Sequence, residues 1–82
     1  MKYYIGRKSK LTGRVDYRRC KCVDKSWVSE KYIRLHPSDV WQFSAQGARK
    51  IVETYNKYRE NKAVGNWGYE YFMVPVSAFL GE

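Results

Sequence analysis

Residues 44–60 read SAQGARKIVETYNKYRE, and this stretch decides which fold the chain can adopt. Ser44 is a favoured N-cap residue, and Phe43 before it is placed to pack against the first helical turn. Apolar side chains then recur at the spacing of one helix face, at Ala48, Ile51, Val52 and Tyr55. The sequence therefore predicts a helix over residues 45–60 with one face available to cover a sheet.

The segments on either side of this helix alternate apolar and polar residues with a period of two, which is typical of strands. Residues 1–25 are predicted to form a β-hairpin, with strands at 2–8 and 14–23 around a turn at 9–13 where Gly13 can adopt a positive φ. Residues 27–35 and 69–76 are predicted as further strands. We expect one α+β domain over residues 1–82, an antiparallel sheet of three to four strands with one helix packed on one face, in the order βββαβ.

The return strand of the hairpin changes its pattern part-way along. In a regular strand Val15 and Tyr17 would point to one face, whereas Cys20 and Cys22 would point to the other. A bulge at residues 18–19 would let both apolar pairs face the core, and it would turn the two arginines at those positions toward solvent.

A single helix can cover only one face of a sheet, so the second face must be solvated or bind something. Alternation in the first strand puts Tyr4 on the face opposite Tyr3 and Ile5. Tyr69 and Tyr71 in the last strand are further candidates for the uncovered face. Pro75 cannot donate a hydrogen bond, so its end of that strand is expected at an edge or with the amide position facing out.

Positive charge is concentrated in the predicted hairpin. The chain has 16 Lys and Arg residues against eight Asp and Glu, a net charge of +8. Residues 1–25 contain nine of these cations and two of the acids, which is a net charge of +7. Such an asymmetric field attracts a polyanion or an acidic protein surface, although a solvated strand pair can also be rich in Lys and Arg.

The candidate binding residues combine these cations with one aromatic ring from the expected open face. They are Lys2, Tyr4, Arg7, Lys8, Lys10, Arg14, Arg18, Arg19 and Lys21. Bases stack on aromatic rings while Lys and Arg neutralise phosphates, so this combination favours single-stranded nucleic acid. A two-stranded ribbon also fits the major groove of duplex DNA.

The sequence offers no set of residues for catalysis, and we expect no enzyme, cofactor or metal. Cys20 and Cys22 lie about 7 Å apart on one strand face, too far for an easy disulfide, and His36 is the only histidine. We therefore predict two reduced, packed thiols and a surface turn at His36. No apolar segment resembles a signal peptide or a membrane span, so we expect a soluble cytoplasmic protein without a membrane partner.

The order of apolar residues between positions 27 and 76 adds a resemblance. Residues 40–44 read VWQFS, Gly47, Ala48 and Ile51 follow, and residues 71–76 read YFMVPV. This order resembles that of small accessory proteins encoded in bacteriophage genomes, with Val40 where the pattern has an alanine. The resemblance implies a phage origin, a location in the host cytoplasm and binding to a host target, and it implies no active site.

Two functions follow as predictions. The first is a non-catalytic binding module that docks its basic hairpin on nucleic acid or on a host nucleoprotein complex. The alternative is a phage-encoded inhibitor of the anti-CRISPR or anti-restriction type, which binds a host defence protein or a host protein that handles nucleic acid, for instance through an acidic surface.

Overall fold

A computed structural model of the chain describes residues 1–21, 26–61 and 68–80 and confirms the α+β class. Within these described residues, five strands form one antiparallel sheet: β1 (Lys2–Ser9), β2 (Val15–Arg18), β3 (Trp27–Val28), β4 (Phe43–Ser44) and β5 (Tyr69–Pro75). The central strand is β1, which pairs with β5 along one edge and with β2 and β4 along the other. The helical segments are α1 (Glu30–Leu35), the 3-10 turn η1 (Pro37–Asp39), α2 (Ala45–Asn61) and α3 (Ser77–Leu80).

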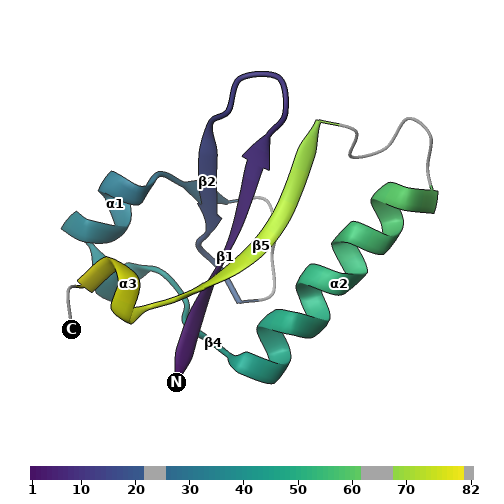
Figure 1. Cartoon of the computed structure of the whole chain (residues 1–82). Helices are drawn as coiled ribbons and strands as arrows, with labels where there is room; N and C mark the ends of the chain where they lie inside the picture. Colours follow the sequence, from purple (N-terminus) through teal and green to yellow (C-terminus); the bar gives the residue numbers. More distant parts are fainter. Residues whose placement is uncertain (22–25, 62–67, 81–82) are drawn as a thin grey trace.

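The predicted helix is α2, and it packs as expected. Its residues Ala48, Ile51 and Val52 lie against Tyr3 and Ile5 of β1 in one hydrophobic cluster. Figure 1 shows α2 along one side of the sheet, with α1 and α3 on the other side. The prediction that the second face lacks a helix is therefore wrong.

That second face carries the larger part of the core. The buried side chains gathered there are Tyr4, Tyr17, Ile33, Val40 and Phe79. They come from β1, β2, α1, the segment after η1, and α3, so short elements far apart in the sequence together replace a second long helix. Because both faces are buried, Val15 and Tyr17 can point away from Tyr3 and Ile5 and still be covered. No bulge is needed to bury them.

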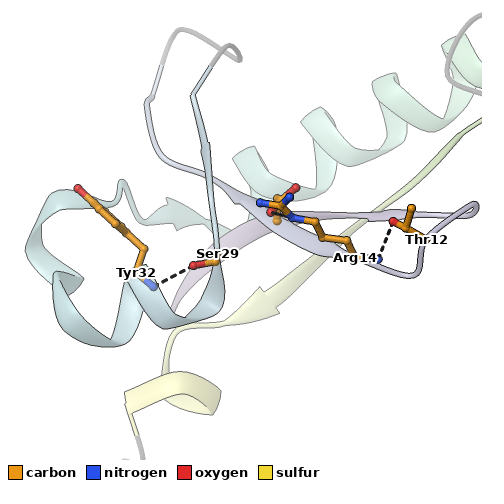
Figure 2. A network of polar contacts seen from close by, with 5 residues as sticks. Thr12, Arg14, Ser29 and Tyr32 are labelled. Carbon is orange, nitrogen blue, oxygen red and sulfur yellow. Dashed lines mark hydrogen bonds and ion pairs between the residues drawn. The ribbon is translucent and has the colours of Figure 1, made fainter.

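The strand predicted over residues 27–35 is mostly helical. Pairing stops after Val28, and the Ser29 hydroxyl then accepts a hydrogen bond from the Tyr32 amide at 3.2 Å, as an N-cap residue does (Figure 2). The Arg34 guanidinium donates to the Glu30 carboxylate at 2.8 Å, the i,i+4 arrangement that supports a helix. These local hydrogen bonds outweigh the strand-like alternation and turn Ile33 into the sheet.

The hairpin forms in the predicted place with a shorter return strand. The turn closes with hydrogen bonds from the Ser9 amide to Arg14 O and from the Gly13 amide to Ser9 O, both 2.8 Å, and Gly13 has a φ of +76°. The Arg14 amide donates to the Thr12 hydroxyl at 3.2 Å (Figure 2). β2 ends at Arg18, whereas the prediction extended it to residue 23; Cys22 and its neighbours to residue 25 lie outside the described residues.

The predicted last strand is β5, and its alternation is confirmed. Phe72 and Val74 join the cluster around Tyr4, while Met73 joins the cluster under α2. Within the described sheet β5 pairs with β1 alone, so its other edge faces α2. There the Asn56 side chain forms hydrogen bonds of 3.3 and 3.4 Å with the carbonyl and amide of Tyr71. Pro75 is four residues after Tyr71, so its backbone nitrogen faces the same outer edge, where its missing N–H breaks no pairing with β1.

Candidate nucleic-acid interface

Tyr4 cannot serve as a stacking platform. Its side chain is fully buried, and its ring lies 5.5 Å from the Phe79 ring at an interplanar angle of 64°. α1 and α3 cover the face on which the sequence placed it. The prediction of Tyr4 as a binding residue is therefore wrong, and the cause is the helix that the sequence reading took for a strand.

Arg18 is also buried, so it cannot contact a nucleic acid or a protein partner. The residue is 6% exposed, and its guanidinium donates to Cys20 O, Lys21 O and the Tyr55 hydroxyl at 3.0 Å each. These hydrogen bonds tie the chain after β2 to α2. Arg18 thus has a structural role, which contradicts the expectation that it points to solvent together with Arg19.

The remaining predicted cations divide between the two ends of the hairpin. Lys8 and Lys10 are exposed near the turn, and Arg14 is paired with Asp16 at 3.2 Å. Arg7 is half-buried between the rings of Trp27 and Tyr69. At the opposite end of β1 the structure brings Lys2, Arg19 and Lys21 together. These three come from separate positions in the hairpin.

A groove of about 530 Å³ joins the last three cations to the segment that follows η1. We call it the Trp41 groove, and its lining includes Lys2, Arg19, Lys21, Asp39 and Trp41. The Trp41 amide donates to Arg19 O at 2.8 Å, which fixes the two segments side by side. The Trp41 side chain is 45% exposed, and the Lys21 ammonium lies 5.1 Å from its ring centroid.

Charge in the Trp41 groove is only partly compensated. The Asp39 carboxylate accepts hydrogen bonds from the Tyr32 hydroxyl and from Arg19, whose Nη2 lies 2.9 Å from Oδ2. The Tyr32 hydrogen bond and then the Arg19 guanidinium lower the pKa of Asp39, and the same contacts raise the pKa values of Tyr32 and Arg19. Asp39 therefore stays ionised and neutralises Arg19. Among the described residues, no carboxylate forms an ion pair with Lys2 or Lys21.

Trp41 is absent from the candidate binding residues that the sequence predicted. Val40 and Trp41 are adjacent and point in opposite directions, since Val40 is 4% exposed and sits in the core. One signal could have identified Trp41: two large apolar residues, Val40 and Trp41, are adjacent in the short segment after Pro37, and only one of them can face the core. Its partners could not be found this way, because they meet it through tertiary contacts.

His36 is exposed at the end of α1, where its ring lies 4.9 Å from that of Tyr32. Cys20 is a half-buried free thiol on the lining of the Trp41 groove. In the parts of the chain that the structure describes, no three His, Cys, Asp or Glu side chains are grouped closely enough to hold a metal ion. Over the same parts, no helix combines the length and apolar character needed to cross a bilayer.

Comparison of the chain with protein-family models, with curated proteins and with solved structures gave no match. The site must therefore be interpreted from its own geometry.

Proposed function

We propose that the protein is a non-catalytic module that binds single-stranded nucleic acid, alone or within a nucleoprotein, in the Trp41 groove. The observation that supports this proposal is a half-exposed indole that lines one groove together with two lysines, neither of which has a carboxylate partner among the described residues. The hairpin supplies the cations, and the segment after η1 supplies the ring.

The chemistry of the Trp41 groove suits a flexible strand better than a duplex. A base of a single strand can turn its face onto the indole, whereas the bases of a duplex have both faces covered by their neighbours. Lys2 and Lys21 would contact phosphates as point charges, with no bidentate contact to a base edge. Binding should therefore depend strongly on salt and weakly on sequence.

Trp41→Ala tests the proposal directly. Loss of one stacked base should weaken binding of a fluorescent single-stranded oligonucleotide by about 5- to 150-fold, equivalent to ~1–3 kcal/mol. The matched control is Leu35→Ala, which removes another exposed apolar side chain and should leave affinity unchanged. Both variants should melt within a few degrees of the parent protein, since both side chains are exposed.

A salt series gives a second measurement on the unmodified protein. If Lys2 and Lys21 each contact a phosphate, log K should fall against log salt with a slope of about −1.4 for a single strand. No binding in low salt, or equal affinity of Trp41→Ala and the parent, would contradict the proposal. Capture of an acidic host protein from nuclease-treated lysate would then favour the alternative of a phage-encoded inhibitor.

A further inference from the structure

A second basic site lies at the other end of β1, around Arg7. Its guanidinium carbon is 4.3 Å from the centroid of the Trp27 ring and 4.4 Å from that of Tyr69. Both rings therefore lie within cation–π distance of the guanidinium. Arg7 and these rings line a pocket of about 430 Å³, which we call the Arg7 pocket, together with residues of the hairpin turn.

The charge of Arg7 has no counter-ion among the described residues. Asp16 is its cross-strand neighbour, but the Asp16 carboxylate is bound by Arg14 at 3.2 Å. The Arg7 Nε atom is inaccessible to solvent and has no hydrogen-bond partner. Aromatic rings attract a cation over their faces, but they do not accept the hydrogen bonds that a guanidinium directs in its own plane. A half-buried arginine in this state is complementary to an anion from outside the chain.

Further donors surround the same pocket. The hydroxyl oxygens of Ser9 and Thr12 already accept hydrogen bonds from backbone amides at 3.2–3.3 Å, so their own O–H groups are left to donate (Figure 2 shows the Thr12 contact). Arg14 and Asp16 neutralise each other, so Arg7 determines the net charge of the Arg7 pocket. Arg7, Ser9 and Thr12 line this one pocket, and a phosphate group has more acceptor oxygens for several donors than the two oxygens of a carboxylate.

We propose that the Arg7 pocket binds a phosphate group, with Arg7 as the principal ligand and the hydroxyls of Ser9 and Thr12 as supporting donors. This site is separate from the Trp41 groove, because Lys2 and Arg7 are five residue steps apart, which is about 17 Å of extended strand. The proposal does not depend on nucleic-acid binding in that groove. Its ligand can be free phosphate or the terminal phosphate of a strand.

The test is a titration of the ¹⁵N-labelled full chain with inorganic phosphate at constant ionic strength, observed through the arginine Nε–H signals. The buried Nε–H of Arg7 should exchange slowly with water and give a resolved signal. We expect this signal to shift and saturate, while those of Arg34 and Arg49 change little. Acetate at the same concentration should produce a much smaller shift.

Variants separate this site from general electrostatics. Arg7→Lys keeps the positive charge but loses the planar set of guanidinium N–H donors. It should weaken phosphate binding by about tenfold or more, measured through the backbone amide signals of the turn. Lys8→Ala removes the neighbouring exposed cation and should change affinity less than about twofold. Equal weakening by both variants, or uniform shifts that do not saturate, would overturn the proposal.

The source of the phosphate is identified in the Trp41→Ala background. Oligonucleotides that carry either a 5′-phosphate or a 5′-hydroxyl are compared there through the same Arg7 signal. A shift with the phosphorylated strand alone assigns the Arg7 pocket to strand ends, whereas saturation by inorganic phosphate alone assigns it to free phosphate. The absence of a response to any phosphate refutes the inference and leaves the Trp41 groove untouched.

Discussion

Replacing Tyr4 by phenylalanine should stabilise the protein. The Tyr4 side chain is fully buried, and its hydroxyl has no hydrogen-bond partner among the described residues. A buried polar group without a partner costs about 1–3 kcal/mol of folding free energy. Tyr4→Phe removes this group and keeps the ring against Phe79. Loss of one heavy atom from the packed core offsets part of the gain, so we expect a net stabilisation of ~1 kcal/mol.

The assay is urea denaturation of both proteins, with the midpoint and the m-value fitted separately. A change of this size corresponds to an increase in melting temperature of about 4–8 °C for a domain of this length. Tyr4→Ala is the matched control, and it should lose about 3–5 kcal/mol through the cavity that it leaves. Destabilisation by Tyr4→Phe would refute the reasoning, because it would show that the hydroxyl has a partner in solution.

Three further predictions concern neighbouring parts of the structure. Gly6→Ala should destabilise the fold by about 1–3 kcal/mol in the same denaturation assay, because a Cβ at this position would lie 2.6 Å from the Phe72 ring. Arg18→Ala should cost roughly 2–4 kcal/mol by leaving its buried hydrogen-bond acceptors unpaired, whereas Arg19→Ala, one residue later and half-exposed, should change stability little. The lowered pKa of Asp39 means that its contacts stabilise the fold above the ordinary value of 3.8, and that this contribution is lost as pH falls through the lower folded pKa. Tyr32→Phe removes the larger cause, so the Asp39 carboxylate should then titrate closer to 3.8 by NMR; an unchanged midpoint would contradict this account.

The spacing of apolar residues predicted those elements that are long enough for the helical or strand pattern to recur several times. The helix at residues 45–60, the hairpin turn and the alternation in β1 and β5 all agree with the structure. α1 was missed because six residues are too few for helical periodicity to exceed a strand-like alternation. Its signals were local: the Ser29 cap and the Glu30–Arg34 pair.

The error in α1 explains the error in the candidate site. Once residues 30–35 are read as a strand, the face that carries Tyr4 has no cover and becomes an apparent binding surface. The sequence shows where the cations of the hairpin lie along the chain. The alternation of residues could not separate buried Arg18 from half-exposed Arg19, because that required knowing that both faces of the sheet are packed. Trp41 meets Lys2 and Lys21 only in three dimensions, so no sequence spacing links them.

The contact between Asn56 and Tyr71 bears on how the protein behaves at high concentration. A free strand edge is a template on which a second copy can add its own strand, and this is a common route to aggregation. Along the outer edge of β5, the Asn56 amide takes up both backbone groups of Tyr71, and Pro75 has no N–H to offer. An incoming strand would meet these obstacles on either side of Met73 and could not form a continuous ladder. α2 thus blocks strand addition at this edge of β5, in addition to covering the core.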